Sequence, residues 1–142
     1  MKTYSYAATF EPTEELGGFV VTFNDVPEAI TEGADMFEAR NMAADALGVI
    51  LLYYLEEGMS LPEARAIGTM IAPHPETAAK IAVIETFRRA GISQTELARR
   101  IGKDEKEARR LLDPNVRTKL PLLVAALAAM GQRLVIGVEA AE

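Results

Sequence analysis

The sequence has no cysteine and no tryptophan, and His74 is its only histidine. The absence of cysteine excludes disulfides and thiolate catalysis, and it favours a cytoplasmic protein. His74 has no second histidine or cysteine with which to share a metal ion, so we expect a linker residue and no metal site. The chain also lacks the glycine-rich motifs that bind nucleotides. We therefore predict no cofactor.

Long apolar runs are missing as well. No stretch approaches the ~20 apolar residues that a membrane span needs, and residues 1–12 hold no apolar segment of the kind found in signal peptides. Hydrophobic residues make up 49 % of the chain and charged residues 25 %, which is typical of soluble globular proteins. The sequence predicts a soluble protein without a membrane partner.

Charge is distributed unevenly along the chain. Residues 1–72 carry three basic and twelve acidic side chains, a balance of −9. Residues 73–142 carry twelve basic and nine acidic side chains, a balance of +3, and the two balances give the formal net charge of −6. This asymmetry indicates different partners for the two parts, with the basic part suited to a polyanion.

The first part has the pattern of a small sheet followed by a helix. Alternating apolar residues predict strands, and a helical period follows the plausible N-cap Asp35 and lasts until Gly58. Glu11 to Gly18 contains Pro12 and two glycines, so a hairpin loop is expected there. Another helical turn is expected over 61–65. The predicted strands are 3–10, 19–23, 30–33 and an edge strand over 69–72.

Pro73-His74-Pro75 is the predicted domain boundary, because prolines hold the chain extended there. We expect an α/β domain over 1–72 and an almost entirely helical domain over 76–142, which is an α+β protein overall. The tail Arg133 to Val138 has a strand pattern but no partner inside its own domain, and such tails often pair across a homodimer or larger homo-oligomer. The predicted helices of the second domain are about 76–90, 94–101, 105–112 and 119–130.

The segment Gly91 to Pro114 predicts a helix-turn-helix. Ser93 followed by Glu96 is a capping box, which begins a helix. Gly102 permits a sharp turn out of that helix. Asp104, with Glu107 three residues on, caps the next helix. Two short helices joined by a tight turn are typical of DNA-binding domains, although the same unit can serve only packing or dimerisation.

In a DNA-binding unit of this kind the second helix lies in the major groove. With Ala108 and Leu111 facing inward, its exposed residues are the candidates for base contacts, since arginine reads guanine and glutamate accepts from cytosine. Lys103 stands where such motifs usually carry a buried aliphatic residue. The predicted base-facing residues are Glu105, Lys106, Arg109 and Arg110. The predicted phosphate-facing residues are Arg99, Arg100, Arg117 and Lys119. Gln94 and Asp104 complete the predicted DNA-binding set.

The sequence resembles the HicB antitoxin family over nearly its whole length. The resemblance rests on GGFVVTFNDVPEAITEG at 17–33 and FEARNMAADAL at 37–47, and on GISQTELARRIG and ARRLLDPNVRTKLPLLVAAL in the C-terminal part. It implies a partial RNase H-like domain that binds and inhibits a small HicA-like toxin, an mRNA-cleaving ribonuclease. It also implies a C-terminal domain that dimerises, ends in a strand and represses the antitoxin's own operon.

Two other readings of the sequence remain open at this point. The chain fits a stand-alone helix-turn-helix regulator whose N-terminal domain senses a ligand or oligomerises. An RNase H-like domain also raises the hypothesis of a two-metal nuclease, but that chemistry needs carboxylates converging within ~4 Å of both ions. The acidic residues of 1–72 lie mostly in loops or beside strands, so we predict no catalytic residues and no enzyme.

Overall fold

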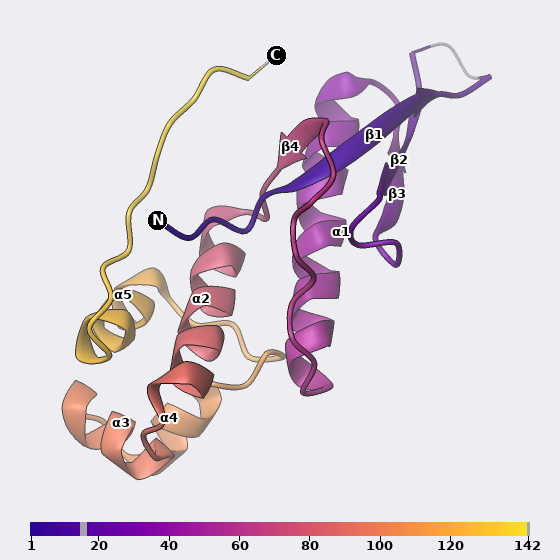
Figure 1. Cartoon of the computed structure of the whole chain (residues 1–142). Coiled ribbons are helices and arrows are strands. Elements are labelled where there is room, and N and C mark those ends of the chain that lie inside the picture. Colours follow the sequence, from indigo (N-terminus) through magenta and orange to yellow (C-terminus); the bar gives the residue numbers. More distant parts are fainter. Residues whose placement is uncertain (15–16, 142) are drawn as a thin grey trace. The chain divides into compact units, whose positions relative to one another are not determined.

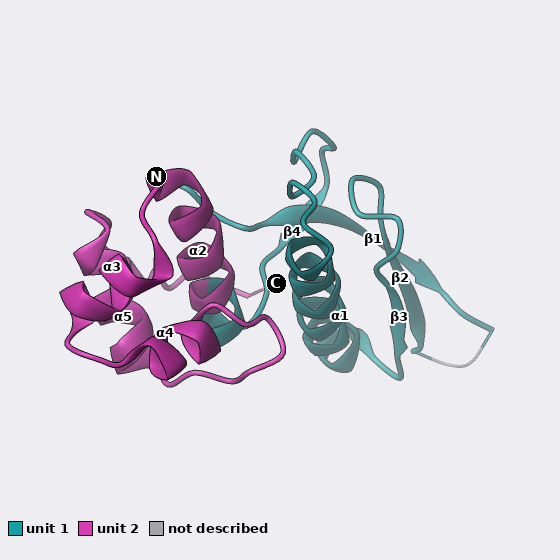
Figure 2. Ribbon diagram, turned by 90° about the horizontal axis from the view of Figure 1, so that it is seen from below, with its two compact units in different colours: residues 1–78 teal, residues 79–142 magenta. Residues whose placement is uncertain are grey.

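The computed structural model describes residues 1–14 and 17–141. These residues form two compact units, 1–78 and 79–142, shown in teal and magenta in Figure 2. The first unit contains a sheet and a helix and the second contains helices (Figure 1), so the predicted α+β class is confirmed. The boundary between the units falls inside helix α2, after the proline-bracketed segment.

The sheet of the first unit has four antiparallel strands in the order β3-β2-β1-β4. Its strands are β1 (Tyr6–Pro12), β2 (Phe19–Phe23), β3 (Ile30–Gly33) and β4 (Thr69–Ile71), and the predicted edge strand is therefore confirmed. The bounds predicted for the first strand were wrong at both ends. The strand begins at Tyr6 and includes Glu11 and Pro12, which were predicted to belong to the loop over 11–18, and Pro12 pairs with Phe19. Residues 15 and 16 of that predicted loop lie outside the described part of the chain. Proline is tolerated at a strand end, where few ladder hydrogen bonds remain to be made.

Helix α1 (Met36–Glu56) covers one face of this sheet (Figure 1). Asp35 is its N-cap and accepts a hydrogen bond from the Glu38 N–H at 2.8 Å, as predicted. The core between helix and sheet contains Val21, Phe23 and Leu47, all fully or almost fully buried. The opposite face of the sheet carries the row formed by the paired residues Thr9, Thr22 and Ile30.

The predicted helical turn over 61–65 was wrong, because residues 59–67 form neither helix nor strand. Asp25, in the β2–β3 turn, accepts the backbone N–H groups of Arg65 and Ala66 at 2.8 and 2.7 Å. Tyr6 in β1 donates its hydroxyl to the Pro62 carbonyl at 2.7 Å. These long-range bonds satisfy backbone groups that a helical turn would otherwise pair.

The second unit is built from the greater part of α2 (Pro75–Ala90) and from three shorter helices. These are α3 (Gln94–Ile101), α4 (Glu105–Leu111) and α5 (Leu120–Ala129), all within one residue of their predicted bounds.

Residues 133–138 form no strand in the single chain, so their pairing across a dimer stays a prediction. None of the helices in the described part of the chain is long and apolar enough to cross a membrane. The core of this unit is formed by Ala79, Val83, Leu97, Leu111, Leu123, Ala126 and Leu127.

Candidate nucleic-acid interface

The turn between α3 and α4 has the caps that the sequence predicted. The Ser93 hydroxyl accepts a hydrogen bond from the Glu96 N–H at 3.0 Å, and Asp104 accepts one from the Glu107 N–H at 2.8 Å. Gly102 ends α3 in the left-handed region, at a φ of +67°. Lys103 then donates its N–H to the Ala98 carbonyl, which closes the turn. Because each helix begins and ends on a local cap, the two short helices are fixed by their own sequence.

Helix α4 presents one buried face and one exposed face. Ala108 and Leu111 are 0 % and 1 % exposed, which confirms that they face the core. The four residues predicted to face the bases are all exposed, namely Glu105, Lys106, Arg109 and Arg110. The helix therefore exposes the four side chains that the helical period assigned to base contact, and base contact itself stays a prediction.

The start of α4 is held by the first turn of α3. The Thr95 hydroxyl donates to the Glu105 carboxylate at 2.7 Å, and the Gln94 side-chain amide donates to the Glu105 backbone carbonyl at 3.3 Å. Glu105 is thus engaged within the protein, although it was predicted to accept from a base. Sequence reasoning missed Thr95, because nothing in its spacing indicates a partner ten residues away.

Two of the predicted phosphate-facing arginines are paired within the unit. Arg99 binds both carboxylate oxygens of Glu96 through Nε and Nη2, at 2.6–3.0 Å. These bonds lower the pKa of Glu96 and raise the pKa of Arg99. Arg100 donates to the Ala129 carbonyl, near the end of α5, at 3.0 Å. These bonds use Nε and Nη2 of Arg99 and Nη1 of Arg100, so each guanidinium keeps further N–H donors that could bind a phosphate.

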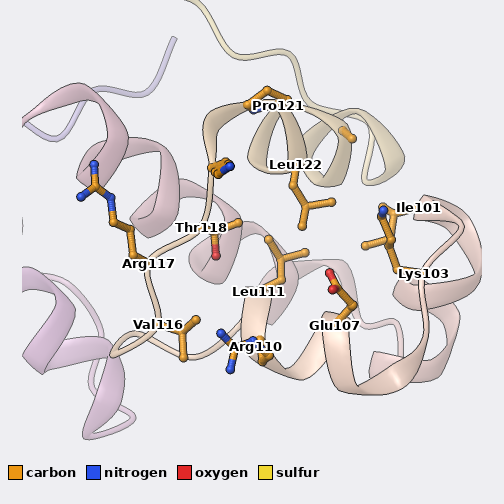
Figure 3. A pocket seen from close by; sticks show the side chains of 12 residues that line it. Ile101, Lys103, Glu107, Arg110, Leu111, Val116, Arg117, Thr118, Pro121 and Leu122 are labelled. Carbon is orange, nitrogen blue, oxygen red and sulfur yellow. The ribbon is translucent and has the colours of Figure 1, made fainter.

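A groove with a volume of about 540 Å³ lies beside α4, between the end of α3 and the start of α5 (Figure 3). The groove is lined by apolar residues together with four cations. One of these cations, Lys103, was not in the predicted DNA-binding set. Glu107 is the acidic residue of the lining. The four cations are Lys103, Arg110, Arg117 and Lys119. The apolar lining residues are Ile101, Leu111, Val116, Pro121, Leu122 and Ala125.

Lys80 of α2 is the buried charged residue of this unit and is only 5 % exposed. Its ammonium donates to the Arg110 backbone carbonyl at 3.1 Å and to the Thr118 hydroxyl at 2.8 Å. Burial lowers the pKa of Lys80 to about 8; the nearby charge of Asp113 opposes this shift and that of Arg110 adds to it. Sequence reasoning missed Lys80, since both partners lie 30 or more residues further along the chain.

The lowered pKa of Lys80 predicts a stability that rises with pH. The folded protein holds this proton less tightly than the unfolded chain, so the cost of burying the charge is complete below pH 8. That cost is removed as the pH rises from about 8 to about 10.5. In denaturant unfolding, the free energy of the natural protein should therefore rise relative to Lys80→Met across this window. The matched control Lys119→Met, which removes an exposed lysine, is measured over the same pH window. A lysine NMR titration that places Lys80 near 10.5 would contradict the prediction.

The described residues include no group of three or more histidine, aspartate or glutamate side chains that could hold a metal ion. The α3–α4 turn carries exposed cations, while the carboxylates of Glu96, Asp104 and Glu105 are engaged in a cap or in side-chain hydrogen bonds. Such a surface can bind a polyanion through charge and shape.

Comparison with known proteins defines the class of protein. A family model described as HicB_like antitoxin of bacterial toxin-antitoxin system matches residues 5–70, which include the first three strands and all of α1. Antitoxin HicB 1 of Photorhabdus laumondii subsp. laumondii is 34 % identical over 140 residues, which cover 98 % of this chain and 90 % of that protein. Antitoxin HicB of Escherichia coli K12 is 35 % identical, covering 91 % and 95 %. Antitoxin HicB of Pseudomonas fluorescens is 30 % identical, covering 97 % and 96 %.

The chain belongs to the HicB antitoxin family, as its sequence pattern predicted. The similarity extends through both compact units and is not confined to the sheet and α1. The relatives are named as antitoxins, which supports an antitoxin role for this chain.

Proposed function

We propose that this chain inhibits a HicA-like, mRNA-cleaving toxin through its first unit and represses its own operon by binding DNA through α3 and α4. The observation that carries the proposal is the similarity to HicB antitoxins over nearly the whole chain. We further propose that the protein acts in the cytoplasm as a homodimer or higher homo-oligomer. The tail 133–138 would pair with its equivalent in another copy.

The DNA half of the proposal is supported by the geometry of α4. Its exposed face carries Lys106, Arg109 and Arg110, and its first turn is fixed by the Asp104 cap. A recognition helix presents its N-terminal turns to base edges, while neighbouring cations bind phosphates. Arg117 and Lys119, on the connector that follows α4, are exposed and suited to phosphates. Half-sites about one helical turn apart are expected for a two-fold dimer.

The toxin half is supported by the charge and the uncovered face of the first unit. Glu11 of β1 and Glu32 of β3 both pair with Val20 of β2, so the two carboxylates flank an apolar side chain on the sheet face opposite α1. Both glutamates are exposed. An acidic surface of this kind suits a toxin whose own surface is basic because it binds RNA.

We expect Arg110→Ala and Arg99→Ala to weaken DNA binding in different ways. Arg110→Ala should cost about 1–3 kcal/mol and relax base preference, because a side chain that reads a base is lost. Arg99→Ala should weaken binding to all sequences alike and reduce the dependence on salt, because a phosphate contact is lost. Competition gel shifts with the DNA upstream of the gene, at several salt concentrations, measure both effects. If neither change alters binding, α4 is not the groove helix.

The second candidate is a stand-alone regulator whose first unit senses a ligand or oligomerises. It is favoured by the same cationic surface and makes the same DNA predictions. The two candidates differ in the product of the adjacent reading frame, since only an antitoxin requires a toxin partner. Co-expression of the two frames separates the candidates directly.

A further inference from the structure

We infer that Lys80 is a positioning residue for DNA binding. Its ammonium joins the end of α4 to the connector between α4 and α5, so that the exposed cations of both segments face DNA together. This inference rests on the proposed function. It is carried by two hydrogen bonds from one buried ammonium, to the Arg110 carbonyl and to the Thr118 hydroxyl.

The two acceptors lie at the end of α4 and in the connector that follows it, the two segments that carry the predicted DNA-binding cations. Arg110 is the residue before the last of α4, so its carbonyl is among those left without an intrahelical partner. This carbonyl also accepts the Asp113 N–H at 3.2 Å, where the connector turns away from the helix. A buried positive charge at this end compensates the partial negative charge of a helix C-terminus.

Thr118 lies between two of the predicted phosphate-facing residues, Arg117 and Lys119. The connector 112–119 has no helix or strand of its own, apart from the turn made by Asp113. The Thr118 hydroxyl accepts a hydrogen bond from Lys80, while Arg117 and Lys119 on either side of it are exposed. The bond from Lys80 therefore orients two exposed cations without using either of them.

The burial of Lys80 has no other evident use within the described residues. An apolar side chain of the same length would fill the space without the cost of desolvating a charge, and such replacements are often neutral or stabilising. A lysine here gains two directed hydrogen bonds between elements that are far apart in sequence. The geometry thus assigns Lys80 to fixing backbone position rather than to overall stability.

The test compares Lys80→Met and Thr118→Val, made in the full chain, with the natural protein. Binding to the DNA upstream of the gene is measured by gel shift from 50 to 200 mM salt, well below the unfolding temperature of each variant. We expect a loss of about tenfold in affinity at 200 mM salt, a larger loss at 50 mM, and a salt slope lower by about 1.8, since two phosphate contacts contribute roughly 0.9 each. The double variant should lose no more than Lys80→Met alone, because Thr118→Val removes one of the two bonds that Lys80→Met already removes.

A readout without DNA separates positioning from folding. Amide hydrogen exchange at Asp113 and Val116, whose N–H groups are hydrogen-bonded in the connector, should quicken in both variants while the exchange of α2 amides stays unchanged. Loss of affinity without this local change, or in proportion to the unfolded fraction, overturns the role of Lys80. The role of Lys80 is also overturned if the natural protein binds the DNA and Lys80→Met binds it with the same salt slope. Natural protein that does not bind its upstream DNA overturns the proposed DNA function itself.

Discussion

Replacing Gly33 by alanine is expected to lower the unfolding free energy of the first unit by about 3 kcal/mol, at the upper end of the cost of overpacking. A Cβ atom at Gly33 would lie 2.3 Å from the backbone nitrogen of Ala39 and 2.6 Å from its Cα. These are backbone atoms in the first turns of α1 and cannot rotate away as the end of a side chain can. Helix α1 must therefore move off β3, which loosens the buried contacts that join helix and sheet.

The measurement for Gly33→Ala is denaturant unfolding followed by tyrosine fluorescence. All four tyrosines lie within residues 4–54, so this signal reports on the first unit. The matched control is Gly68→Ala in the same unit, because a Cβ there makes only ordinary contacts, 3.5 Å from the Ala7 Cβ and 3.6 Å from the Ala8 carbonyl oxygen, and the backbone is not in the left-handed region. A Gly33→Ala midpoint equal to that of the control would show that α1 does not approach β3 as described.

The second large effect is expected from Leu111→Ala. Leu111 is 1 % exposed and belongs to the core that joins α4 to α2, α3 and α5. Truncating a buried leucine costs about 2–5 kcal/mol, since the transfer free energy and the cavity both count. DNA binding should weaken as well, because α4 loses the buried side chain that packs it against the other helices of the unit.

The matched control for Leu111→Ala is Val124→Ala on α5, whose side chain is 42 % exposed. Thermal unfolding followed by circular dichroism should show a loss several times larger for Leu111→Ala than for the control. Equal losses would mean that Leu111 is not a core residue of this unit.

Local sequence signals predicted most of the fold because most of its helices are bounded by local interactions. Asp35, Ser93 and Asp104 each cap a helix through a backbone N–H three residues on. Gly102 ends α3 through its own backbone conformation. Local signals did not predict the conformation of segments that depend on distant partners. Residues 59–67 are an example, because Asp25 in the β2–β3 turn binds two of their backbone N–H groups.

The same distinction applies to the candidate site. The helical period correctly placed Arg109 and Arg110 on the exposed face of α4, because a helix fixes which residues share a face. It did not show that Glu105 is held by Thr95, or that Lys80 reaches the Arg110 carbonyl. Those contacts depend on how the helices of the second unit pack.

The central claim is that this chain is the antitoxin of a pair, and co-expression with the adjacent reading frame tests it most directly. The chain carries an affinity tag, and the mass of the purified assembly is measured. We expect a stoichiometric small basic partner that arrests growth when expressed alone and is silenced by this chain. If the chain is recovered alone, and the neighbouring product is harmless without it, the antitoxin role is contradicted.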